Sequence, residues 1–116
     1  MLYHGSCHCG RIAYEVESEP VSQVIECNCS ICQRRGHLLF FVPRSHLRLT
    51  TPEEHIASYS FNTHRIRHQF CPVCGCGPFG LGTDPQGNEM AAINARCLED
   101  IDLAALQRQQ YDGRSH

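Results

Sequence analysis

Eight of the nine cysteines fall into three short clusters whose spacing is typical of metal-binding proteins. In each cluster only one or two residues separate neighbouring cysteines, and the clusters are Cys7-x-Cys9, Cys27-x-Cys29-x-x-Cys32 and Cys71-x-x-Cys74-x-Cys76. Thiolate sulfurs that hold a tetrahedral zinc ion at about 2.3 Å lie roughly 3.8 Å from one another, which such spacing allows. The cysteines therefore predict two zinc sites.

Disulfide bonds are the alternative use of so many cysteines. Nine is an odd number, so the cysteines cannot all pair within one chain. Disulfide frameworks also tend to close longer loops than those between cysteines one or two residues apart. Metal binding is the favoured interpretation, and we expect a reducing, cytoplasmic environment.

Composition and charge favour a single globular domain and disfavour nucleic-acid-binding and membrane proteins. The 116 residues, 41% hydrophobic and 19% charged, are typical of one globular domain, and we expect residues 1–116 to form it. The formal net charge is -2, and two zinc ions on seven thiolates would make it about -5. This charge disfavours a nucleic-acid partner. No apolar run approaches the ~18 residues of a membrane helix, and residues 1–6 are too short and polar for a signal peptide. The oligomeric state is left open.

The segments that position the clusters are predicted to be short strands joined by turns. Residues 11–17 alternate cleanly, with Ile12, Tyr14 and Val16 on one face, which indicates a half-buried strand. The continuous apolar run 38–42 predicts a buried strand. Further strands are expected at 21–26, 47–50, 56–61, 64–70, 79–81 and 89–95.

Helical structure is predicted only in short pieces. Ser30 is expected to cap a helical turn that Gly36 ends, directly after the middle cluster. Asp102 is expected to cap a short helix over residues 103–109, and residues 111–116 are expected to form a loose tail.

The cysteine motifs, taken in order, resemble those of a known family. They are Gly5-Ser6-Cys7-His8-Cys9-Gly10, Cys27-Asn28-Cys29-Ser30-Ile31-Cys32, Phe70-Cys71-Pro72-Val73-Cys74-Gly75 and Asn94-Ala95-Arg96-Cys97-Leu98-Glu99-Asp100. The resemblance is to the glutathione-dependent formaldehyde-activating enzymes, a family that also includes centromere protein V. It implies a mainly β fold, a β-tent of antiparallel sheets pinned by zinc, with short helical turns. It also implies S-(hydroxymethyl)glutathione synthase or related carbon-sulfur lyase activity, with glutathione as cosubstrate and formaldehyde or a related small carbonyl as its partner.

The resemblance also implies which cysteines share an ion. It assigns four cysteines to a structural zinc site, which are Cys7, Cys9, Cys71 and Cys74. It assigns Cys27, Cys29 and Cys32 to a second, catalytic zinc site. A site with four cysteines has no position left for substrate, whereas three protein ligands leave one for an incoming thiol. We therefore expect one zinc to stabilise the fold and the other to activate the glutathione thiol.

A second closed site is the competing interpretation. Cys76, Cys97 or a histidine could provide a fourth ligand to the middle cluster. The protein would then be a non-enzymatic, zinc-stapled binding module with two structural ions. Cys76 could also lie beside an open metal as a redox-active thiol.

Charged residues near the middle cluster are candidates for substrate contacts. Either Arg34 or Arg35 could offset the thiolate charge while the other binds a glutathione carboxylate, although a solvated turn would contain the same residues. Arg65 and Arg67 are further candidates for carboxylate binding. His37 is the histidine closest in sequence to the cluster and the candidate general acid or base.

Overall fold

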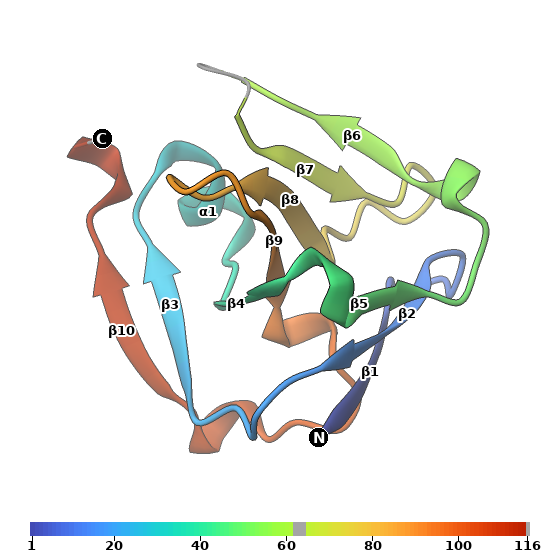
Figure 1. Ribbon diagram of the computed structural model, residues 1–116, viewed down its shortest axis with the longest axis horizontal. Coiled ribbons are helices and arrows are strands. Elements are labelled where there is room, and N and C mark those ends of the chain that lie inside the picture. Colours follow the sequence, from blue (N-terminus) through green and yellow to red (C-terminus); the bar gives the residue numbers. More distant parts are fainter. Residues whose placement is uncertain (62–64, 116) are drawn as a thin grey trace.

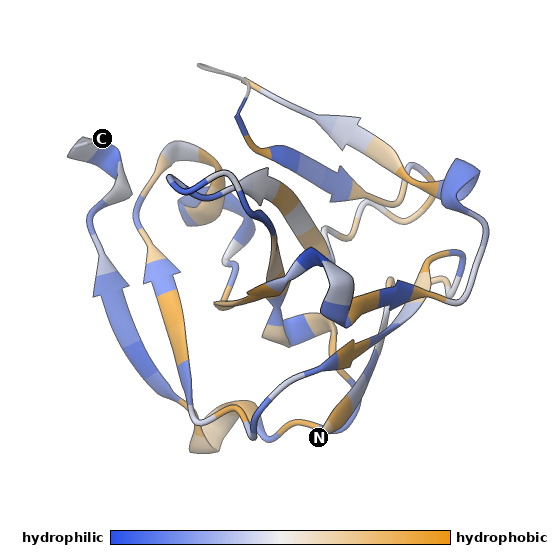
Figure 2. Cartoon of the chain, viewed as in Figure 1, coloured by the Kyte–Doolittle hydropathy of each residue, from blue (hydrophilic) through white to orange (hydrophobic). Residues whose placement is uncertain are grey.

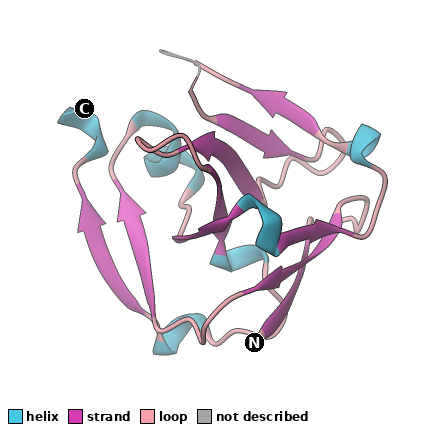
Figure 3. Ribbon diagram, in the orientation of Figure 1, coloured by secondary structure: helices cyan, strands magenta, loops and turns pink. Residues whose placement is uncertain are grey.

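The computed structural model describes residues 1–61 and 65–115, and these form strands in two sheets with a few short helices (Figures 1 and 3). The smaller sheet is antiparallel with the order β1-β2-β5. Its strands are β1 (Leu2–Ser6), β2 (Ala13–Glu17) and β5 (Leu47–Leu49). The mainly β class predicted from the sequence is confirmed, although β1 was not predicted.

The larger sheet has the strand order β10-β3-β4-β9-β8-β7-β6. Its strands are β3 (Gln23–Cys27), β4 (Leu39–Pro43), β6 (Ala57–Tyr59), β7 (Arg67–Phe70), β8 (Phe79–Thr83), β9 (Glu89–Asn94) and β10 (Gln107–Tyr111). Its pairs are antiparallel except β10 with β3, which run parallel and depart from the antiparallel expectation. β7 begins later than the strand predicted at 64–70, and His64 lies outside the described residues.

Helical structure is short, as predicted. The α-helix α1 (Ser30–Arg35) ends at Gly36, whose φ of 70° is left-handed and whose N–H donates to the Cys32 carbonyl. Cys29, rather than the expected Ser30, is the residue at the N-cap, and it makes no side-chain capping bond. The remaining helical elements are single 3-10 turns at Arg44–His46, Glu53–His55, Ala95–Cys97, Leu103–Ala105 and Gly113–Ser115. No helix in the described part of the chain is long and apolar enough to cross a membrane.

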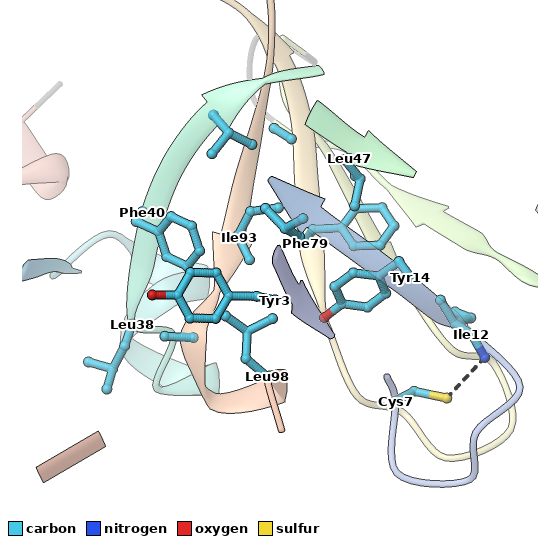
Figure 4. Packing of buried hydrophobic residues seen from close by; sticks show 14 of the residues in the cluster. Tyr3, Cys7, Ile12, Tyr14, Leu38, Phe40, Leu47, Phe79, Ile93 and Leu98 are labelled. Carbon is cyan, nitrogen blue, oxygen red and sulfur yellow. Dashed lines mark hydrogen bonds between the residues drawn. The ribbon is translucent and has the colours of Figure 1, made fainter. Parts of the chain in front are cut away.

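The hydrophobic core lies between the two sheets (Figure 4). The predicted face of Ile12, Tyr14 and Val16 is confirmed, since each of these side chains is at most 1% exposed. The Tyr14 ring meets Phe79 edge-on at 5.2 Å between centroids. A Cβ atom on Gly5 would lie 2.5 Å from the Tyr14 ring, so glycine is required in β1 for this packing.

The central strands of the larger sheet have two different faces. The register places Phe40 beside Ile93 and Ile93 beside Phe79, and these side chains point into the core. On the opposite face Phe41 pairs with Ala92 and is 52% exposed. The apolar run 38–42 forms a strand from Leu39 onward, but the expectation that the run is buried is wrong for Phe41.

The C-terminal region differs most from the sequence-based expectation. Asp102 accepts a hydrogen bond from the Ala104 N–H at 3.2 Å, as a capping residue should. However, the turn lasts only three residues, and the chain then extends into β10 along β3. The helix predicted over residues 103–109 is therefore wrong, because pairing with β3 overrides the local helical preference.

Candidate functional site

Four cysteine sulfurs far apart in the sequence meet at one end of the smaller sheet. The sulfurs all lie within 4.8 Å of one another and belong to Cys7, Cys9, Cys71 and Cys74. The Sγ atoms of Cys7 and Cys9 are 3.7 Å apart, and those of Cys9 and Cys71 are 3.6 Å apart. These distances fit the edges of a tetrahedron of sulfurs around zinc, for which roughly 3.8 Å is expected. The group therefore suits a closed four-sulfur metal site.

Backbone N–H groups hold the sulfurs of this first cluster. The Ile12 N–H donates to Cys7 Sγ at 3.3 Å, as Figure 4 shows, and the Cys74 N–H donates to Cys71 Sγ at 3.4 Å. Hydrogen bonds from the N–H groups of Cys76 and Cys9 lower the pKa of Cys74 to about 5. Metal ligands must be deprotonated, so these hydrogen bonds favour the thiolate form that a metal requires.

The second cluster is formed where β3 leads into α1. Cys27 is the last residue of β3, Cys29 precedes the helix and Cys32 lies within it, and the three sulfurs lie within 4.8 Å of one another. Burial raises the pKa of Cys29, but hydrogen bonds, first of all from the Cys32 N–H, leave it below its ordinary value. Among the described residues no fourth cysteine, histidine or carboxylate joins this group. The donor set fits a zinc ion with one position left for another ligand.

The positions of Cys76 and Cys97 bear on the closed-site alternative. The Cys76 sulfur accepts a hydrogen bond from the His8 N–H, which lowers its pKa, but burial and the neighbouring Cys74 thiol outweigh this effect and raise the pKa overall. Burial, together with the nearby sulfurs of Cys76 and Cys7, raises the pKa of Cys97 to about 11. Both side chains thus lie beside the first cluster rather than the second. Neither is placed to close the second site.

A cavity of about 750 Å³ lies over the second cluster, and all three of its cysteines line it. Arg34, one of the two arginines expected to contact glutathione, also lines this cavity. Arg35 does not, because its guanidinium lies over the Phe70 ring at 5.7 Å from the centroid. Of the other two candidate arginines, Arg65 lines the cavity and Arg67 does not.

Two histidines, one of them predicted, lie on the wall of the cavity. His37 is 8% exposed, and burial, assisted by the positive charge of Arg35, lowers its pKa to about 4. Burial and Arg35 also lower the pKa of His68. Both imidazoles are therefore neutral near pH 7 and can accept a proton.

The C-terminal residues, expected to be a loose tail, lie beside the end of β3 (Figure 1) and line the cavity over the second cluster. The Asn28 N–H donates to the Tyr111 carbonyl at 3.1 Å, and the Asn28 amide donates to Asp112 at 3.0 Å. In return, the Arg114 N–H donates to the Asn28 side-chain oxygen at 2.9 Å. Tyr111, Gly113 and Arg114 thereby become lining residues that sequence reasoning missed. Their segment has neither a metal-ligand motif nor an apolar period that could have revealed this role.

Comparison with known proteins identifies the family. The model of the family described as glutathione-dependent formaldehyde-activating enzyme matches residues 2–113. The chain belongs to this family. The resemblance seen in the cysteine motifs is thus confirmed, and the family is named for the activation of formaldehyde with glutathione.

A solved structure is similar to this chain in sequence and in fold. It is the crystal structure of a Rhodobacter sphaeroides protein determined as a structural genomics target, and it is 28% identical to this chain. The match covers 94% of this chain and 100% of the other, with a TM-score of 0.77. The arrangement of sheets described above is therefore also found in that protein.

The position of Gly113 leads to a testable prediction about zinc binding at the second cluster. Its N–H donates to the Cys27 sulfur, and a Cβ atom at this position would overlap that sulfur and lie 3.2 Å from Cys29 Cβ. We expect Gly113→Ala to displace either the tail or Cys27 and to weaken zinc binding at the second cluster by roughly 10- to 100-fold. Chelator competition followed by zinc quantification would measure this.

The matched control for Gly113→Ala is Gly82→Ala. An added Cβ atom on Gly82 has its nearest contact at 3.5 Å, an ordinary packing distance. This variant should retain zinc like the unsubstituted protein. If Gly113→Ala also retained both ions with unchanged affinity, the contact between the tail and the second cluster would have no role in metal binding.

Proposed function

We propose that the protein is a zinc-dependent carbon-sulfur lyase of the S-(hydroxymethyl)glutathione synthase type. It would add the glutathione thiol to formaldehyde or a related small carbonyl, and it would cleave the adduct in reverse. One observation carries the proposal: the sulfurs of Cys27, Cys29 and Cys32 converge on a large cavity, and no fourth protein ligand joins them among the described residues. The family name, which includes glutathione and formaldehyde, supports the choice of substrates.

The two cysteine clusters would have different roles. The first, closed by four sulfurs, would hold a structural zinc ion that contributes to folding free energy. A zinc ion bound by the second cluster would supply Lewis acidity that favours the thiolate form of an incoming thiol. In the addition, the sulfur-carbon bond forms, the carbonyl π bond breaks, and the thiol proton ends on the carbonyl oxygen.

Residues around the cavity would bind the substrate and move the proton. Arg34 would pair with a glutathione carboxylate, since it lines the cavity and forms no salt bridge within the described residues. Arg35, stacked on Phe70, would act only through its positive charge on the neighbouring histidines. The His37 imidazole would relay a proton between solvent and the carbonyl oxygen without retaining it, because its pKa of about 4 keeps it neutral near pH 7 and the proton of a bound thiol is released to solvent.

The expected domain organisation, cellular environment and partners are also part of this proposal. A single domain in a reducing, cytoplasmic environment would keep the thiols free for metal and substrate. Small-molecule thiols and aldehydes would be its partners, with neither nucleic acid nor membrane involved. The rival, a binding module with two closed sites, is disfavoured because Cys76 and Cys97 lie beside the first cluster.

Calorimetric titration of the zinc-loaded protein with glutathione tests the proposed function. Glutathione should bind and release a proton, which is detected by repeating the titration in buffers of different ionisation enthalpy. S-methylglutathione, which cannot form a thiolate, should bind at least about tenfold more weakly because it lacks the charge-assisted interaction. Equal binding of the two compounds, or binding without proton release, would contradict thiol activation and favour the binding module.

A further inference from the structure

Exposed apolar side chains gather around the second cluster. The described chain has seven large hydrophobic residues that are strongly exposed, and three of them line the cavity. These are Phe41, Ile66 and Tyr111, which are 52%, 50% and 49% exposed. Such grouping of exposed apolar surface is characteristic of a binding site.

The strand register explains how this apolar surface is built. Ile25 pairs with Leu39, and Phe41 pairs with Ala92, all on the face of the larger sheet that points away from the core. Ala92 also pairs with Gly80, so two small residues lie in a row beside the Phe41 ring. The small residues Ala92 and Gly80 leave space for the cavity. The larger side chains of Ile25, Leu39 and Phe41 form its apolar walls.

The charged residues of the cavity are all basic. Arg34, Arg65 and Arg114 line it, whereas the described lining residues include no aspartate or glutamate. None of the three arginines forms a salt bridge within the described part of the chain. The side-chain hydrogen bonds of Arg34 and Arg114 go to neutral acceptors, the Ser30 carbonyl and the Gln33 side-chain amide. The cavity is therefore complementary to a ligand that combines carboxylates with a sizeable apolar group.

Formaldehyde matches this cavity poorly. It adds one carbon to the sulfur, yet the cavity measures about 750 Å³. The carbonyl carbon must lie within bonding distance of the thiol sulfur at the second cluster, so its substituent would extend over the surrounding wall. A one-carbon substituent would leave Phe41 and Ile66 in water, whereas a longer one would bury them, and each buried CH₂ raises affinity about fourfold.

Resting on the proposed function, we infer that the carbonyl partner of this enzyme is an aldehyde with a bulky apolar group, such as an alkyl chain of several carbons or an aromatic ring. The thiol would carry the carboxylates that the arginines bind. The aldehyde carbon bonds to the thiol sulfur, the carbonyl π bond breaks, and the thiol proton passes to the oxygen. The product is a hemithioacetal whose apolar group packs on Phe41, Ile66 and Tyr111.

Calorimetric titration with stable S-alkylglutathiones tests this inference without any turnover. S-hexylglutathione should bind at least about thirtyfold more tightly than S-methylglutathione, which corresponds to burial of half or more of its five additional methylenes. Phe41→Ala should reduce the ratio of the two affinities about tenfold. Leu2→Ala is the matched control, because Leu2 is 45% exposed and does not line the cavity, and it should leave the ratio unchanged. Equal binding of the two thioethers would overturn the inference.

The rate at which glutathione and an aldehyde form their adduct, measured by NMR, separates this inference from the proposed function. With glutathione present, the enzyme should accelerate adduct formation with phenylacetaldehyde at least about tenfold more, in kcat/KM, than with formaldehyde. A preference for formaldehyde would overturn the apolar substrate and leave the lyase proposal standing. Absence of acceleration with every aldehyde, together with no proton release on glutathione binding, would overturn both.

Discussion

Cys71→Ser is expected to abolish the cooperative folding of this protein. Cys71 is fully buried, and its sulfur lies 3.6 Å from that of Cys9, 62 positions earlier in the chain. The four-sulfur site thus joins the loop after β1 to the loop after β7. Apparent zinc-binding free energies at structural sites are about 10–16 kcal/mol, which is comparable with the roughly 5–15 kcal/mol stability of a whole domain. Circular dichroism on heating should therefore show no unfolding transition for this variant.

Cys76→Ser is the matched control for Cys71→Ser. Its sulfur lies close to the same cluster but is not among the four that converge. This variant should keep a cooperative transition and both zinc ions, counted by mass spectrometry under non-denaturing conditions. A folded Cys71→Ser protein that still holds two ions would show that the first cluster is not the structural site.

Cys29→Ser should have the largest effect on function with little effect on the fold. Cys29 occupies the N-cap of α1, where serine is a favoured residue, so the helix itself should tolerate the change. Its loss leaves the second cluster with two sulfurs, and we expect one zinc ion per chain instead of two. Glutathione binding should weaken at least about 100-fold, because the thiol loses its partner at the cavity. Zinc quantification and the calorimetric titration would measure the two effects.

Two comparisons make the Cys29→Ser result decisive. Cys97→Ser removes another sulfur beside the first cluster, and it should retain both glutathione binding and the second ion. The melting temperature of Cys29→Ser should remain within a few degrees of the unsubstituted protein, since the first cluster is intact. If thiol binding survived in Cys29→Ser, glutathione would not be held at the second cluster, and the proposed catalytic role of that cluster would be wrong.

Patterns within short stretches of the sequence predicted the features that depend on neighbouring residues alone. The alternation of Ile12, Tyr14 and Val16 predicted β2 because one face of a strand must be buried. The cysteine spacing likewise predicted the second cluster, because its three cysteines are close together in the sequence and their sulfurs lie within 4.8 Å of one another. The partnership between the two distant halves of the first cluster required the family resemblance, since spacing alone does not pair them.

The parts that were not predicted depend on contacts between distant segments. Residues 107–111 contain three glutamines and no apolar alternation, so nothing local indicates that they pair with β3. The docking of Gly113 against Cys27 follows only from that pairing. The exposure of Phe41 has a related cause, because an apolar run gives no sign that one of its faces is the wall of a cavity rather than the core.

The parallel pairing of β10 with β3 also matters for self-association. Without β10, β3 would be an edge strand whose unpaired N–H and C=O groups flank the apolar residues Val24 and Ile25. Such an edge can add a strand from another molecule and begin aggregation. β10 covers it and is the edge strand in its place; its residues are exposed, and most of them are hydrophilic, as the colours of Figure 2 show. Because β10 is synthesised some 80 residues after β3, β3 has no partner on this side in the newly made chain until residues 107–111 have been translated.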